Sequence, residues 1–114
     1  MIEINLPMPP STNGLWVNVP GRGRVRSRIY KKWATEAGWE LQLQRPKKIK
    51  GNYSLTILLS KLRRGSDVAN REKALSDLLQ THGIIENDSL LQDLHMKWDD
   101  QVKSGWVKLI LEPV

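Results

Sequence analysis

The residues that could carry out chemistry lie in one acidic part of the sequence: Asp67, Asn70, Lys73, Asp77 and Asp88. Carboxylate and amide oxygens are ligands for Mg²⁺, which binds a few protein oxygens and keeps several waters. Bound Mg²⁺ promotes phosphodiester cleavage, because it lowers the pKa of a water molecule and stabilises charge on the phosphate. A lysine beside such a site can bind the scissile phosphate or stabilise the leaving oxygen. These residue types therefore predict a metal-dependent nuclease site.

Each of these residues has a role in that chemistry and also a plainer explanation. Asp67 and Asp88 are the expected Mg²⁺ ligands, and Asp77 is a third ligand or a group that orients one. Lys73 is expected to bind phosphate, and Asn70 to orient a ligand or bond to the substrate. The plainer interpretation is that Asp67 caps a helix while Lys73 and Asp77 form an ion pair along it. Residue spacing alone is compatible with both interpretations.

A helix from about Val68 to Thr81 must position most of this group. At roughly 100° per residue, Asn70, Lys73 and Asp77 share one narrow face of that helix. Glu72 points away from this face and from the apolar face, so it is excluded from the predicted site. The apolar face, which we expect to be buried, consists of Ala74, Leu75, Leu78 and Leu79.

The other predicted elements form the frame of this site. A second helix is predicted from about Arg28 to Arg45, with Ser27 as its N-terminal cap and Pro46 ending it. This order of elements predicts a single α/β domain spanning residues 1–114, with a mixed sheet and two main helices. We expect strands at 2–6 and 53–59, a hairpin over 15–27, and a second hairpin formed by 90–98 and 105–111.

Positive charge is unevenly distributed: the net charge is +6, and 13 of the 18 lysines and arginines lie between Arg22 and Arg64. Lysines and arginines collect phosphates and release counterions, which suits a protein that binds DNA. Alternating arginines at positions 22 to 28 would share one face of a strand, as a row of phosphate contacts or as a solvated edge that resists aggregation. The expected DNA-contacting residues are Arg22, Arg24, Arg26, Arg28, Lys47, Lys48, Arg63 and Arg64.

Several classes of protein are disfavoured by what the sequence lacks. It has no cysteine, which excludes disulfides and thiolate metal sites. It has no apolar run of about 20 residues to span a membrane, and its first residues do not resemble a signal peptide. No glycine-rich phosphate loop follows a predicted strand, so a nucleotide cofactor is not expected. We therefore expect a cytoplasmic protein without membrane or nucleotide partners.

Four segments of the sequence resemble the signature of the RusA-type Holliday-junction resolvases. The family pattern reads roughly D-x-D-N-x-x-K, then D-x-L, then G-x-x-x-D-D, with L-P-x-P-P-S-x-N near the start. The corresponding segments here are Asp67–Lys73, Asp77–Leu79, Gly83–Asp88 and Leu6–Asn13. They occur in the family's order and extend over nearly the whole chain, so the resemblance is specific.

This resemblance implies a homodimeric, Mg²⁺-dependent crossover junction endodeoxyribonuclease with a RusA-like fold. Such an enzyme hydrolyses phosphodiesters, nicking opposing strands of four-way DNA junctions in DNA recombination and repair. By position, Asp67 and Asp88 match the family's metal-binding aspartates. Lys73 matches its essential lysine, and Asn70 the neighbouring asparagine. A two-fold dimer with one site per subunit suits two symmetric cuts.

Two positions depart from the family pattern. Ala69 stands where the second aspartate of D-x-D is expected, and Asn87 replaces the first aspartate of the later pair. An amide offers an oxygen to a metal but no charge, so Asp77 is expected to supply a missing carboxylate. Two other interpretations stay open: a branched-DNA-binding module with weakened catalysis, and a nuclease that cuts flaps and other branched DNA.

Overall fold

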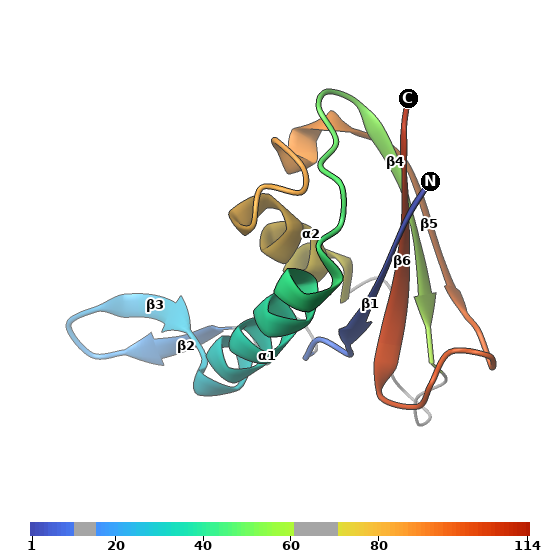
Figure 1. Cartoon of the computed structure of the whole chain (residues 1–114). Helices are drawn as coiled ribbons and strands as arrows, with labels where there is room; N and C mark the ends of the chain where they lie inside the picture. The colour runs from blue at the N-terminus through green and yellow to red at the C-terminus, as the bar shows by residue number, and fades with distance from the viewer. Residues whose placement is uncertain (11–15, 61–70) are drawn as a thin grey trace.

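The structure, a computed structural model, describes residues 1–10, 16–60 and 71–114 of the chain. It contains a mixed four-stranded sheet, a separate two-stranded hairpin, and two α-helices on one face of the sheet (Figure 1), which confirms the predicted α/β class. Within these residues, neither α-helix combines the length and apolar character needed to cross a membrane. The elements are β1 (Ile2–Pro7), β2 (Trp16–Val19), β3 (Gly23–Arg26), α1 (Arg28–Gln44), β4 (Tyr53–Leu59), α2 (Glu72–Thr81), the 3₁₀-helix η3 (Asp88–Leu90), β5 (Leu91–Trp98) and β6 (Trp106–Pro113).

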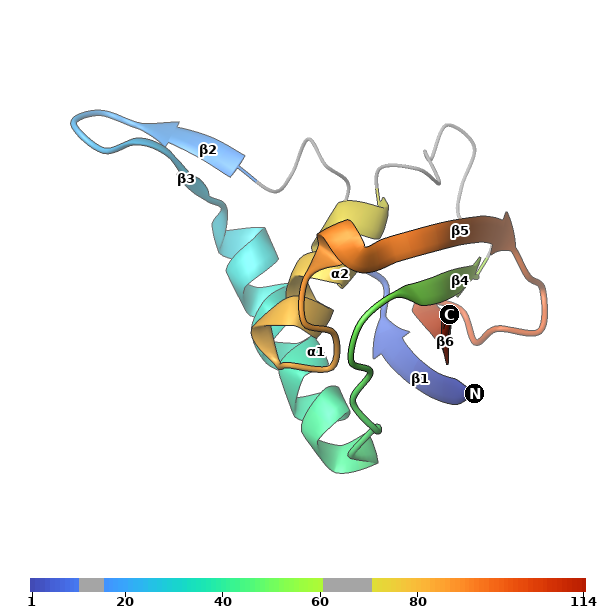
Figure 2. The same ribbon diagram turned by 90° about the horizontal axis from the view of Figure 1, so that it is seen from above.

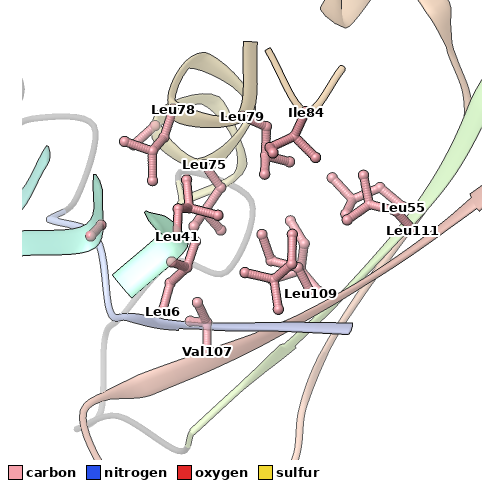
Figure 3. Packing of buried hydrophobic residues seen from close by; sticks show 14 of the residues in the cluster. Leu6, Leu41, Leu55, Leu75, Leu78, Leu79, Ile84, Val107, Leu109 and Leu111 are labelled. Atoms are coloured by element: carbon pink, nitrogen blue, oxygen red, sulfur yellow. The ribbon is translucent and has the colours of Figure 1, made fainter. Parts of the chain in front are cut away.

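The buried face of the sheet follows from the alternation of side chains along its central strands. In β4, Tyr53, Leu55, Ile57 and Leu59 are fully buried, while the residues between them are half-buried. Strand β6 has the same two-residue period, so both strands turn one apolar face toward the helices. Figure 3 shows leucines of α1 and α2 packed against these side chains in a single cluster.

The strand order differs from the prediction at the C-terminal end of the chain. The order is β1-β6-β4-β5, so β4 lies between the two strands that the sequence predicts to pair as a hairpin. The connection between β5 and β6 passes around the end of β4, where Asp99 N–H donates to the Leu59 carbonyl over 2.8 Å. Ser60 N–H donates to the Trp106 carbonyl over 3.2 Å. The hairpin prediction is wrong because β4 is hydrogen-bonded on both sides, parallel to β5 and antiparallel to β6, which local turn signals do not reveal.

Helix α1 closes the edge of the sheet that β1 forms. The Gln44 side chain bonds this edge as a strand backbone would, since its Oε1 accepts from Asn5 N–H over 2.8 Å. Its Nε2 donates to the Asn5 carbonyl over 2.6 Å. Further along the edge, Trp33 Nε1 donates to the Pro7 carbonyl over 2.9 Å. Of the two sheet edges, β5 is therefore the one that α1 leaves open.

Helix α2 packs beside α1 on the same face of the sheet, and all four of its predicted apolar residues are buried. Where α2 meets α1, Gly38 of α1 has no side chain and so leaves room for His82. A Cβ at position 38 would lie 3.0 Å from His82 Nε2. Gly83 ends α2 with φ +73°, the left-handed conformation that glycine adopts readily. Ile84 N–H then donates to the Leu79 carbonyl over 2.9 Å as the chain turns back.

Strands β2 and β3 form the predicted hairpin, which projects from the N-terminal end of α1 away from the sheet (Figure 2). Only Arg24 and Arg26 belong to β3, because Arg22 lies in the turn and Arg28 is the first residue of α1. The prediction that four arginines share one strand face is therefore wrong. The strand has only four residues, and Ser27, which accepts from the Tyr30 N–H over 3.1 Å, starts the helix as predicted.

Leu79→Ala is expected to lower the free energy of unfolding by about 2–5 kcal/mol, because it leaves a cavity between α2 and the sheet. Urea unfolding followed by circular dichroism measures the change. Leu43→Ala is the control, since Leu43 is 77% exposed on α1 and its truncation should cost less than about 0.5 kcal/mol. Equal losses in the two variants would contradict this packing.

Candidate active site

The loop that leads from α1 to β4 is bonded to the connector that follows α2. Ile49 N–H donates to the Ile84 carbonyl over 2.8 Å, and Gly51 N–H donates to Glu86 Oε1 over 2.6 Å. These bonds hold the connector against the start of β4 and fix the point at which η3 begins. Long-range hydrogen bonds therefore position the acidic end of the connector.

Asn87 and Asp88, at the start of η3, have different environments. Asn87 Oδ1 accepts from Ser89 N–H over 2.8 Å, so its amide oxygen caps η3. Asp88 N–H donates to Gln80 Oε1 on α2 over 3.0 Å, while Asp88 itself is exposed. Asp88 is thus the member of the pair whose side chain is available to a ligand.

Glu72, excluded from the predicted site on helical periodicity, begins a row of polar residues on α2 that ends at Gln80, which bonds to η3. Glu72, Ser76 and Gln80 follow one another at four-residue spacing, so they form one stripe along the helix. Ser76 Oγ donates to Glu72 Oε1 over 2.5 Å, and Gln80 bonds to η3. Ser76 is only 2% exposed, so the covered face of α2 is wider than its leucines indicate. The exclusion of Glu72 from the site stays a prediction.

Tyr53, the first residue of β4, carries a buried phenol that feels the charges of Asp88 and Glu72. Its side chain is fully buried, and its Oη has no hydrogen-bond partner among the described residues. Burial raises the pKa of Tyr53 to about 12, and the carboxylates of Asp88 and Glu72 add to the rise. Two carboxylates, one from α2 and one from η3, therefore act on one buried phenol. Sequence reasoning did not anticipate this buried phenol, because Tyr53 reads as a core aromatic.

The other predicted site residues are placed only in part. Asp67 and Asn70 lie outside the described residues, and so does the predicted start of the helix, since α2 begins at Glu72. Lys73 is exposed on α2, and Asp77 is half-buried there. Within the described ranges, no three histidine or acidic side chains form a group that could hold a metal ion. The roles of these residues in catalysis and metal binding stay predictions.

The described DNA-contacting candidates lie toward the two ends of α1. Arg28 and the hairpin residue Arg22 are exposed on the N-terminal side, and Lys47 and Lys48 are exposed just past the C-terminal end. A helix of 17 residues is about 25 Å long, so the two groups would contact different phosphates. Two further candidates, Arg24 and Arg26, lie on β3, and the last two, Arg63 and Arg64, fall outside the described residues.

A hollow of about 530 Å³ lies on the opposite face of the sheet from the Tyr53 phenol. Its lining includes Leu58 of β4, Val102 of the connection between β5 and β6, and Trp106, the first residue of β6. Leu58 alternates with the buried residues of β4, which places the hollow on the face that the helices do not cover. The hollow is therefore separate from the buried phenol of Tyr53.

A family model described as Endodeoxyribonuclease RusA matches residues 7–109, a range that includes Tyr53, Glu72 and Asp88. The chain belongs to this family. RusA-family proteins are endodeoxyribonucleases that resolve Holliday junctions, so the predicted nuclease class and DNA substrate are confirmed at that level. Among curated proteins, none matches the chain.

Tyr53 gives this RusA-family protein a predicted loss of stability in alkali. Its phenol ionises near pH 10 in the unfolded chain and near 12 in the folded chain, so between these values only the unfolded chain releases the proton. The stability that the neutral phenol contributes is complete below pH 10 and is lost as the pH rises toward 12. Between about pH 9 and about pH 11, the free energy of unfolding should fall by about 1.3 kcal/mol more in the wild type than in Tyr53→Phe. Urea unfolding at each pH measures the difference. Parallel pH profiles for the two proteins would contradict the buried phenol.

Proposed function

We propose that this chain is a Mg²⁺-dependent endodeoxyribonuclease that resolves four-way DNA junctions by paired symmetric nicks, in DNA recombination and repair. The observation that carries the proposal is the RusA family match over residues 7–109. Within that range, Asp88 is an exposed acid held in place by Gln80 of α2. The family match supports the substrate class, and this exposed acid supports metal-dependent chemistry.

The acidic side chains in this part of the chain are of the kind that bind a divalent cation. The carboxylates of Glu72 and Asp88 act on one buried phenol, and among the described residues neither forms an ion pair with a lysine or arginine. A cation would neutralise the resulting negative potential. Mg²⁺ commonly binds through one or two carboxylates and keeps several waters, so a complete protein cage is not required. Asp67 and Asp88 would hold the ion, with Asp77 as a third acidic group.

The remaining proposed catalytic residues act on the substrate. Bound Mg²⁺ would supply an activated water and neutralise charge on the phosphate. Lys73 is exposed on α2, so its ammonium group can bind the scissile phosphate and stabilise the leaving oxygen. Asn70 would orient a ligand or bond to the substrate. Metal binding thus falls to Asp67 and Asp88, and substrate positioning to Asn70 and Lys73.

Exposed cations near both ends of α1 support a broad DNA-binding surface. Lys47 and Lys48 belong to the loop that is bonded to the connector before Asp88, so they would hold phosphates near the cut. The hairpin with Arg22 in its turn projects from the rest of the chain and would reach DNA farther away (Figure 1). Because such contacts release counterions, binding should weaken steeply as the salt concentration rises.

We also propose that two chains form a homodimer by pairing their β5 strands. Leu94 and Trp98 of β5 are 40% and 37% exposed, and Met96 lies between them on the same face of the strand. An open edge with apolar side chains favours pairing with another chain, whereas Gln44 covers the opposite edge. Antiparallel pairing of two β5 strands gives a two-fold dimer with one site per subunit, which suits two symmetric cuts.

A branched-DNA-binding module with weakened catalysis is the second candidate function. It is favoured by the bond between the Asn87 amide oxygen and Ser89, which commits that oxygen to capping η3, and by the lack of charge at Ala69. A nuclease that cuts flaps and other branched DNA is a broader form of the first proposal. Mg²⁺-dependent nicking of synthetic four-way, flap and linear duplex DNA separates the three functions.

Asp67→Asn is expected to bind four-way junctions like the wild type and to lose nicking by on the order of 100-fold or more, because a metal-binding charge is removed. Gel shifts measure binding, and denaturing gels measure nicking. Asp100→Asn is the control, since Asp100 is exposed in the connection between β5 and β6. Wild-type nicking by Asp67→Asn would refute the role of Asp67.

Leu94→Lys is expected to convert a dimer into a monomer, because a charge would replace an apolar contact at the paired β5 strands. Sedimentation velocity at the concentration used for nicking measures the oligomeric state. Leu43→Lys is the matched control, since it places the same charge on an exposed leucine of α1. A monomeric wild type, or a dimeric Leu94→Lys, would rule out this interface.

A further inference from the structure

We propose that the hollow on the open face of the sheet binds one unstacked base of a DNA strand, with the indole of Trp106 as the stacking surface. The hollow measures about 530 Å³, a size that falls within the range of about 300–1,000 Å³ usual for ligand sites. The inference rests on the proposed nuclease function and deepens it, because a base can enter only where DNA is unpaired or branched. Among the described residues, none that is assigned to catalysis or metal binding lines the hollow.

Three neighbouring strands form the floor of the hollow. Trp106 and Lys108 alternate along β6 with fully buried residues, so both side chains lie on the face that the helices do not cover. In the register of the sheet, Lys108 stands opposite Asn5 of β1 on one side and opposite Leu58 of β4 on the other. The floor therefore combines an aromatic ring with an aliphatic side chain, an amide and an ammonium group.

The connection between β5 and β6 forms the wall of the hollow, and hydrogen bonds hold it in place (Figure 1). Gly105 N–H donates to Ser60 Oγ over 3.1 Å, and Ser60 is only 2% exposed. Trp106 N–H donates to the Lys103 carbonyl over 3.0 Å. The hollow is thus built into the fold before any ligand binds, so little ordering is needed when a ligand enters.

The Trp106 ring is held in place but is not fully covered by the protein. Trp106 is half-buried, and the Lys103 ammonium lies 5.6 Å from the centre of its ring. Lys103 is exposed, so its side chain can swing away from the ring when a base stacks there. Leu58 and Val102 add apolar surface to the same hollow. Stacking on an aromatic side chain accepts any base, since every base has a flat π face.

The polar side chains of the hollow suit the rest of a nucleotide. Lys103 forms no ion pair among the described residues, so its ammonium can bind a DNA phosphate. Within the same part of the chain, the side-chain amides of Asn5 and Gln101 have no hydrogen-bond partner, and an amide can bond to the edge of a base as donor and as acceptor. Asp99 Oδ1 accepts from Gln101 N–H over 2.9 Å, which leaves Oδ2 to accept from the amino group of a base. Sites that bind single-stranded nucleic acid have this composition, in which aromatic rings stack on bases and cations hold the backbone.

A purely structural role explains less of this arrangement. The contact between Lys103 and Trp106 would brace the connection between β5 and β6. That connection is already held by the bond from Asp99 N–H to the Leu59 carbonyl, and a brace needs no hollow beside it. A protein partner in the hollow would have to bury the charges of Lys103 and Asp99, whereas DNA places a phosphate next to the ammonium group.

Binding of the full chain to labelled duplexes, measured by fluorescence anisotropy in EDTA, tests the site without any cleavage. One duplex is fully paired, and a second carries one extra unpaired nucleotide. The wild type is expected to bind the second duplex about tenfold more tightly, because one base gains a stacking contact. A third duplex, with an abasic sugar as the extra nucleotide, should bind like the paired one, since it keeps the phosphate and lacks the base.

Trp106→Leu is expected to lower the preference for the unpaired base about tenfold and so to bind the first two duplexes alike. Trp39→Leu is the matched control and should keep the preference, since Trp39 is 62% exposed on α1 and does not line the hollow. Thermal unfolding shows whether each variant is folded. If Trp106→Leu does not fold, Lys103→Gln decides, because Lys103 is exposed. It should lower the preference about threefold, and Lys32→Gln on α1 should leave it unchanged.

Several results would overturn the inference. Equal binding of the paired and unpaired duplexes by the wild type is one, and a wild-type preference in Trp106→Leu or an equal loss in Trp39→Leu is another. Equal affinity for the abasic duplex and the duplex with the unpaired base would show that DNA flexibility alone is sensed. A changed oligomeric state of Trp106→Leu in sedimentation, with the preference intact, would assign the hollow to a second copy of the chain.

The nicking assay keeps this inference apart from the proposed function. A preference that depends on Trp106, in a chain that nicks no four-way junction, would refute the proposed function and leave the base site standing. Junction nicking by a wild-type chain that shows no preference for an unpaired base would refute the base site and leave the function standing.

Discussion

The structure depends above all on β4, a strand that is hydrogen-bonded on both sides and buried on one face. Its buried side chains support α2, and its first residue, Tyr53, pairs with Leu91 at the start of β5. Because η3 leads directly into β5, the pairing of β4 with β5 also determines where Asp88 stands. One strand therefore holds the core together and sets the position of η3, where Asp88 stands.

The two edges of the sheet have opposite character. At β1, the Gln44 amide occupies the backbone groups of Asn5 that a further strand would use. At β5, Leu94 and Trp98 stay partly exposed along the open edge. Among the described residues, β5 is the edge that Gln44 leaves unbonded, and the proposed pairing of two β5 strands would use it to form a closed pair and not an extended fibre.

The parts of the fold that follow from local pattern could be predicted, and those that depend on distant segments could not. The two-residue period of β4 and the capping of α1 by Ser27 are local, and the structure agrees with both. The partners of β4 are set by long-range hydrogen bonds, so the turn residues after Trp98 suggested a hairpin that does not form. The contact between α2 and η3 is of the same kind: helical periodicity tells which residues share a face, but not that Gln80 bonds to η3.

The assignment of Asp88 as a catalytic carboxylate in a junction-resolving nuclease can be tested by single-turnover nicking of a strand-labelled four-way junction. With Mg²⁺, the wild-type chain should nick two opposing strands at symmetric positions. Asp88→Asn should bind the same junction and leave its strands intact. Nicking by Asp88→Asn at the wild-type rate, or a wild-type chain that nicks no strand of the junction, would contradict the assignment.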